Sequence, residues 1–210
     1  MKAGDSINQL KQRLETDPDV VLLDFSCFPA AKDEEILALE KSFSQEFPAV
    51  LKELYKFSNG LQVRWNYKST DLPYQSDIEK SRKPFPWLWP AEHYWQLDGV
   101  INILPLEEVF DRDYKDFMWF DFEKDYKARW NGIEMNMQAF KKNLRPFDVY
   151  DKYYTVAIYP DQQYPVLLGE DHNADFLNYL PLNFSAYFEF LLDSRGAVNE
   201  RVDFFNRKKE

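Results

Sequence analysis

The sequence is poor in the residues from which most metal and catalytic sites are built. It has one cysteine, Cys27, and two histidines, His93 and His172, among 210 residues. One cysteine excludes an internal disulfide, and two isolated histidines without H-x-H or H-E-x-x-H spacing do not predict a metal site. The six glycines stand singly, so the phosphate-binding and dinucleotide-binding glycine motifs are absent. We expect no metal, no cofactor and no catalytic residue.

Basic residues and long apolar runs are also scarce. Lys and Arg number 26 against 36 Asp and Glu, a formal net charge of −10, whereas binding to nucleic acid requires a basic face. The most apolar early run, VVLLDF, is too short to cross a membrane, and the first fifteen residues lack the apolar segment of a signal peptide. The sequence predicts a cytoplasmic protein that binds neither nucleic acid nor membrane. The negative charge would favour a basic protein partner or serve solubility alone.

The apolar periodicity predicts helices and strands in a mixed order. Helices are expected at 6–15, from Asp33, from Pro48 and at 184–196, with a helical turn after Pro105 and a helix at 137–144. Strands are expected at 19–28, from 61 to 67, from Gly99, at 117–122, and as a hairpin across 153–171. The fold class is therefore α+β, with a mostly antiparallel sheet flanked by helices in a single domain, 1–210. Two segments, 68–98 and 123–152, are predicted to be insertions, and RVDFFNRKKE a charged tail.

One aromatic cluster stands out in the first insertion. The stretch PFPWLWPAEHYW contains Trp87, Trp89, Tyr94 and Trp95 between prolines. Such a cluster predicts either a clasp packed on the core or a surface that binds a partner, where Trp and Tyr commonly dominate the binding energy.

The stretch DFEKD places Asp121, Glu123 and Asp125 on one side of an extended segment, because side chains alternate along a strand. We consider these carboxylates candidates for partner contacts. Two carboxylates in a cleft could also hydrolyse a glycosidic bond, with Trp87 and Trp89 stacking on sugar rings. Solvated surface charge is the simpler alternative, and the spacing of a calcium-binding loop is absent.

One short stretch, in which the spacing of apolar residues changes, carries the strongest resemblance to a known family. In ELYKFSNGLQVRW the apolar spacing changes from helical to alternating at Ser58-Asn59-Gly60, which predicts a helix, a left-handed stop and a strand. The surrounding stretch, EEILALEKSFSQEFPAVLKELYKFSNGLQV, resembles the opening signature of the SUKH superfamily. The later stretches GVINILPLEEV and FSAYFEFLL resemble the family's strand with a Leu-Pro-Leu turn and its closing aromatic helix. The matching signature positions are Ile36, Glu40, Pro48, Asn59 and Gly60, within a core of about 33–193.

The resemblance implies a function as well as a fold. The superfamily includes fungal regulators of cell-wall (glucan) synthesis and many bacterial immunity proteins, so it implies a non-enzymatic protein-binding module. The expectation is an immunity protein that binds and neutralises a toxin through the two insertions, and a basic toxin would fit the acidic charge. A carbohydrate-active or carbohydrate-binding protein and a regulator of cell-wall synthesis remain the alternatives.

Overall fold

The fold comes from a computed structural model of the chain. It describes residues 2–44, 46–70, 97–111, 127–130, 133–136, 145–149, 155–158, 166–169 and 178–206. The helices are α1 (Ala3–Thr16), α2 (Asp33–Phe43), α3 (Ala49–Phe57), α5 (Leu106–Asp111), α7 (Phe184–Asp193) and α8 (Val198–Asn206). The strands are β1 (Val20–Cys27), β2 (Leu61–Tyr67), β3 (Gly99–Ile103), β4 (Lys127–Trp130), β5 (Ile133–Asn136), β6 (Arg145–Val149), β7 (Thr155–Ile158), β8 (Val166–Gly169) and β9 (Asn178–Leu182).

Seven of the strands form one sheet in the order β1-β2-β3-β6-β7-β8-β9, and every neighbouring pair is antiparallel. Strands β4 and β5 pair separately. The strands of this sheet keep the order that they have in the chain, with β4 and β5 left out between β3 and β6. The connections from β1 to β2 and from β2 to β3 are long, at residues 28–60 and 68–98. The α+β class with an antiparallel sheet is confirmed, as is the pairing of β7 with β8 in the predicted hairpin.

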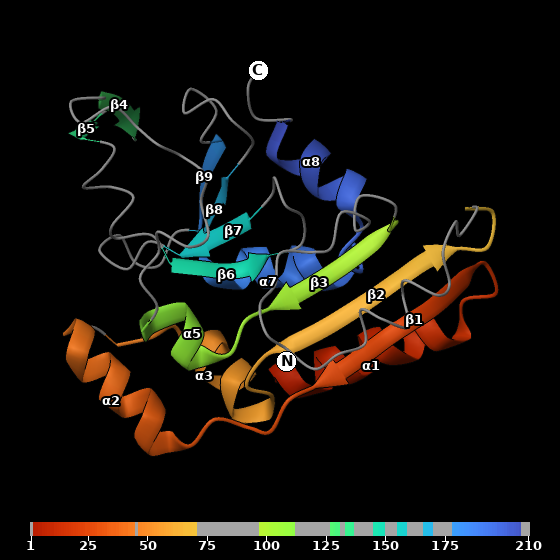
Figure 1. The fold of residues 1–210 in the computed structure, drawn as a ribbon, viewed down its shortest axis with the longest axis horizontal. Coiled ribbons are helices and arrows are strands. Elements are labelled where there is room, and N and C mark those ends of the chain that lie inside the picture. The colour runs from red at the N-terminus through yellow and green to blue at the C-terminus, as the bar shows by residue number, and fades with distance from the viewer. Residues whose placement is uncertain are drawn as a thin grey trace.

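Three helices, α1, α3 and α7, pack against one another behind the sheet (Figure 1). Ile7, Leu10 and Leu14 form the buried stripe of α1, as their helical spacing predicts. Leu51, Leu54 and Tyr55 do the same in α3. The inward side chains of β2 and β3 meet these helices and complete one contiguous core. Within the described ranges, every helix is too short or too polar to span a bilayer.

Three segments differ from the sequence-based expectation. Residues 201–206, expected to belong to a charged tail, are part of α8, whose Arg201 is fully buried. Residues 145–149, placed in the second insertion, form the internal strand β6, next to β3. The strand β9 was not predicted at all. In each case contacts distant in sequence replace a weak local signal.

Two predicted elements cannot be compared, because the strand at 117–122 and the helix at 137–144 lie outside the described residues.

Position 99 must be a glycine because the indole ring of Trp65 packs directly against it. Trp65 lies opposite Gly99 in the ladder, and a Cβ on residue 99 would come within 2.0 Å of the Trp65 indole. The indole cannot swing away easily, because it is fully buried and its Nε1 donates to the Arg195 carbonyl at 2.7 Å.

We expect Gly99→Ala to lower the free energy of unfolding by ~1–3 kcal/mol, the usual cost of overpacking a core. Urea denaturation measures the change. Adding Trp65→Leu should make the double variant more stable than the sum of the single effects predicts, since the smaller side chain removes the clash. Strict additivity would show that the ring is not the cause.

Candidate interaction surface

The residues predicted to bind a partner are Trp87, Trp89, Tyr94, Trp95, Asp121, Glu123 and Asp125. All seven lie outside the described residues, as do both histidines. The structure does describe the five signature positions and the base of the first insertion.

The signature residue Asn59 joins two stretches that are 47 positions apart in the chain. Its Oδ1 accepts a hydrogen bond from the Leu106 backbone N–H at 2.7 Å, and its Nδ2 donates to Glu107 at 3.0 Å. The first N–H groups of a helix have no partner within the helix. Pro105, which precedes α5, has no side-chain acceptor, so Asn59 supplies the cap from a distance.

The junction therefore connects the start of β2 to the turn after β3. Gly60 has a φ of 113°, and a Cβ there would lie 3.1 Å from the Ile103 carbonyl oxygen. The Tyr55 hydroxyl donates to the Leu104 carbonyl at 3.0 Å, and burial raises its pKa well above the usual range. The Ser-Asn-Gly and Leu-Pro-Leu motifs thus form one joint in space.

The other signature residues fix the link between α2 and α3. Glu40 accepts a hydrogen bond from the Phe47 backbone N–H at 2.7 Å, which ties the end of α2 to the start of the next helix. Pro48 stands at the cap of α3, where its carbonyl accepts from Lys52 at 3.0 Å. Ile36 is the buried residue of α2. Hydrogen bonding to Glu46 raises the Lys52 pKa, and an ion pair to Glu40 at 3.3 Å adds to this.

The two ends of the first insertion are held together by Asp98. Its Oδ2 accepts from the Tyr67 backbone N–H at 2.8 Å and from the Thr70 hydroxyl at 2.7 Å. Its own backbone N–H donates to the Asn66 side chain at 2.8 Å. Because these contacts are local to the ends of β2 and β3, they form a closed base from which residues 71–96 depart.

A second set of contacts supports this base from behind. Besides receiving the Trp65 indole N–H, Arg195 places its guanidinium 5.2 Å from the Trp65 ring centroid. The guanidinium also pairs with Asp17 at 2.5 Å. The Asp19 backbone N–H and Arg195 lower the pKa of Asp17, so the pair is ionised at neutral pH.

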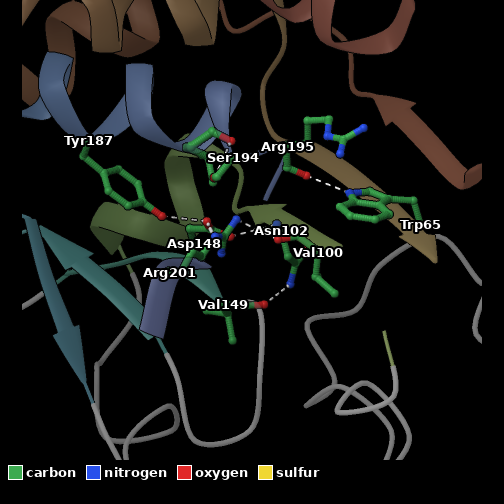
Figure 2. A network of polar contacts seen from close by, with 10 residues as sticks. Trp65, Val100, Asn102, Asp148, Val149, Tyr187, Ser194, Arg195 and Arg201 are labelled. Atoms are coloured by element: carbon green, nitrogen blue, oxygen red, sulfur yellow. Dashed lines mark hydrogen bonds and ion pairs between the residues drawn. The ribbon is translucent and has the colours of Figure 1, made fainter. Parts of the chain in front are cut away.

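Four elements of the fold converge on the buried carboxylate of Asp148 (Figure 2). The carboxylate accepts from the Tyr187 hydroxyl at 2.9 Å and from the Asn102 backbone N–H at 2.8 Å, and it pairs with Arg201 at 3.1 Å. Arg201 also donates to the Val100 carbonyl at 2.7 Å. These contacts join β6, α7, β3 and α8.

This network is structural, since Asp148, Arg201 and Tyr187 are all 0% exposed and no substrate can reach them. The sequence offered a weak signal for Asp148, a charge between apolar residues in RPFDV. It offered none for Arg201, which stands in a segment predicted to be a charged tail.

A groove with a volume of about 370 Å³ lies between α1 and α7. Ala3, Phe188 and Leu192 are buried apolar residues in its wall. Two exposed carboxylates, Glu189 and Asp193, stand at its edge. Sequence reasoning missed this groove, because it assigned α7 a packing role alone.

Among the residues that the structure describes, no group of three or more potential metal-ligating side chains occurs. The residue Cys27 is exposed, and partial desolvation by the surrounding protein raises its pKa. A raised pKa keeps the thiol protonated, which is the opposite of what a nucleophile requires.

Comparison of the sequence with protein-family models and with curated proteins finds no match.

The contribution of the Asn59 cap to stability can be separated from that of the exposed Asn59–Glu107 hydrogen bond. We expect Asn59→Ala to lower the free energy of unfolding by about 1 kcal/mol, the typical cost of removing a helix cap. Glu107→Ala removes the exposed side-chain bond alone and should cost less than ~0.5 kcal/mol. Equal losses in chemical denaturation would show that the cap contributes nothing beyond that bond.

Removing one partner of the buried ion pair should be costly. Asp148→Asn leaves the Arg201 guanidinium buried beside a neutral amide, so we expect a loss of ~3–5 kcal/mol in the free energy of unfolding. Tyr187→Phe removes one hydrogen bond to the carboxylate and should cost ~1.5–3 kcal/mol.

A double variant separates the pair from general disruption of the core. Asp148→Asn with Arg201→Met should lose less than the two single variants together, because neither charge is then left uncompensated. Additive losses in urea denaturation would contradict a direct interaction between the two groups.

Proposed function

We propose that this chain is a SUKH-type protein-binding module, without enzymatic activity, that acts as a cytoplasmic immunity protein by binding and neutralising a toxin. The observation that carries the proposal is the Asn59 joint. The Ser-Asn-Gly and Leu-Pro-Leu motifs, on which the resemblance rests, contact each other through the Asn59–Leu106 hydrogen bond at 2.7 Å. Motifs that meet in one structural unit support a shared fold more strongly than motifs scattered along a chain.

The way the first insertion is attached supports a binding role. Residues 68–98 connect two adjacent antiparallel strands, and Asp98 closes their base with hydrogen bonds to Tyr67 and Thr70. A segment rooted on a rigid base can differ between related proteins without disturbing the sheet, which is how binding loops are commonly carried. The tryptophans Trp87, Trp89 and Trp95 belong to this segment and are the proposed anchors.

The second insertion comes after α5 in the chain, and α5 lies at the end of β3 opposite to the base formed by Asp98 (Figure 1). We assign the carboxylates Asp121, Glu123 and Asp125 to a separate, electrostatic part of the interface.

The charge of the chain fits a basic partner. A net charge of −10 attracts a basic protein over long distances and raises the rate of association. Toxins that act on nucleic acid need a basic face to bind phosphate. A basic nuclease is therefore the partner class that the charge favours.

Replacement of residues 71–96 by a short Gly-Ser linker tests the proposal. The sheet should keep its fold, because the Asp98 contacts and the β2–β3 ladder remain. Partner binding should fall by at least ~10-fold if the tryptophans are anchors, since a few buried aromatic residues carry most of the energy of an interface.

The measurement is affinity capture from the source organism's lysate at low and high salt, with identification by mass spectrometry and then titration of the purified partner. Circular dichroism and thermal unfolding of both forms provide the control for folding. A basic toxin held by the native chain and lost by the loop variant supports the proposal. Capture of no protein, with binding to a glycan array or release of sugar, would favour the carbohydrate alternative instead.

A further inference from the structure

The groove between α1 and α7 contains charges that the helix itself disfavours. Glu189 and Asp193 are four residues apart on α7, so the two carboxylates are neighbours on one helix face, and like charges at this spacing are destabilising. Asp193 is also the last residue of the helix, where the helix dipole is negative and favours cations. The last turn of α7 contains no basic residue.

Neither carboxylate has an ion-pair partner among the described residues. Glu15, Asp17, Asp24, Asp33, Glu40, Glu46 and Asp148 each pair with a lysine or arginine. Asp5, Glu34 and Asp203 share the lack of an ion pair among the described residues, so it is the placement of Glu189 and Asp193 on one face at the end of α7 that distinguishes them. Glu189 and Asp193 thus repel each other, and the Arg13 guanidinium that reaches this end of α7 donates to a backbone carbonyl rather than to either carboxylate. Departures of this kind from local consistency concentrate at functional positions.

The wall of the groove is suited to more than a bare cation. Ala3, Phe188 and Leu192 are almost fully buried beneath it, and Val50 of α3 contributes a further apolar surface. Its volume of about 370 Å³ exceeds what one ion requires. Lysine and arginine have an apolar stem and a charged end, so they match a wall of this composition next to carboxylates.

The groove already attracts one guanidinium from the chain itself. Arg13 of α1 donates through Nη2 to the Leu192 carbonyl at 2.5 Å, at the C-terminal end of α7. This contact uses a backbone acceptor and leaves both carboxylates for another cation.

We propose that the groove docks a basic amphipathic segment of a protein partner, with a lysine or arginine paired to Glu189 and Asp193 and an apolar side chain against Val50, the partly exposed apolar residue of the wall. The inference rests on the proposed function in so far as it supposes a protein partner. It concerns a face made by α1 and α7 rather than the two insertions.

A model peptide provides the first test. The probe is a helical peptide of leucine and lysine at amphipathic spacing, compared with the same peptide carrying glutamate in place of lysine. Glu189→Gln with Asp193→Asn should weaken binding of the lysine peptide about fivefold at low salt, as expected for two exposed ion pairs. Ser185→Lys, one turn before Glu189, should weaken it similarly by supplying an internal cation.

The matched control removes the same charge from distant exposed positions. Glu34→Gln with Asp203→Asn changes the net charge equally, on α2 and α8. If both double variants weaken binding of the lysine peptide equally, the attraction comes from net charge alone and the groove is not the binding site. If neither double variant affects binding of the lysine peptide, the proposal is also overturned. Perturbation of the backbone amide signals of α1 and α7 by the lysine peptide should accompany binding, and perturbation confined to other elements would also overturn the proposal.

Thermal stability gives an independent readout. Removing the two carboxylates should raise the Tm of the free protein by about 1–2 °C, because it relieves the repulsion and the unfavourable helix-end charge. The control double variant should not. An unchanged or lowered Tm for Glu189→Gln with Asp193→Asn would contradict the charge conflict from which the inference starts.

The test separates the groove from the proposed function. If the toxin binds the Glu189→Gln, Asp193→Asn variant with unchanged affinity, the groove is wrong and the immunity function stands. If the lysine peptide binds the groove as expected but no toxin is captured, the groove stands and the immunity function fails.

Discussion

The buried carboxylate of Asp148 constrains more of this fold than any other polar group described. A charge in a protein interior must be paired and hydrogen-bonded, because it has lost its hydration. Asp148 obtains its partners from β3, α7 and α8, so these elements can pack in few other arrangements without leaving a charge unpaired. The ion pair with Arg201 thereby holds the C-terminal helix on the sheet. Breaking a buried pair by removing one partner is costly, because the remaining charge is left uncompensated in the core.

In the first half of the chain, the neutral side chain of Asn59 also joins several elements of the fold. Its amide satisfies the free N–H of Leu106 and at the same time links α3 and β2 to β3 and α5. Gly60 permits the close approach of the Ile103 carbonyl that this arrangement needs. Asp98 holds the two ends of the segment between β2 and β3 together through Tyr67 and Thr70.

The acidic side chains of the described residues fall into different environments. Several form ion pairs within the chain, as in the Asp17–Arg195 and Asp24–Arg64 pairs. Glu189 and Asp193 are different, since they repel each other on one helix face and Asp193 also adds to the negative end of the helix dipole. Such a placement can favour binding, because a cationic partner removes in the complex the repulsion between carboxylates that is present in the free protein. The proposed insertions and the α1–α7 groove would then supply two separate contacts with a basic partner.

The elements with strong periodicity were predictable from the sequence. The stripe of Ile7, Leu10 and Leu14, the alternation from Leu61 to Tyr67 and the glycine stop after α7 predict their helices and strands from local spacing. The alternation was wrong about the exposed face of β2, because Arg64 and Asn66 are buried at 5% and 1% exposure. The same reasoning predicted the α+β class and the junction at Asn59-Gly60. Local pattern was also sufficient to mark Pro48 as the start of α3.

The roles of the polar residues became visible only in three dimensions. Arg201 lies in a segment whose charges suggest a solvated tail, yet an acid 53 positions earlier draws it into the core. Asn59 matches a helix stop in sequence, but its amide caps a helix that begins 47 positions later. The conflict at Glu189 and Asp193 emerges when α7 is known to end at Asp193 beside α1. Hydrogen bonds and ion pairs are directional and join residues at any separation, so a one-dimensional pattern fixes burial far better than it fixes polar partners.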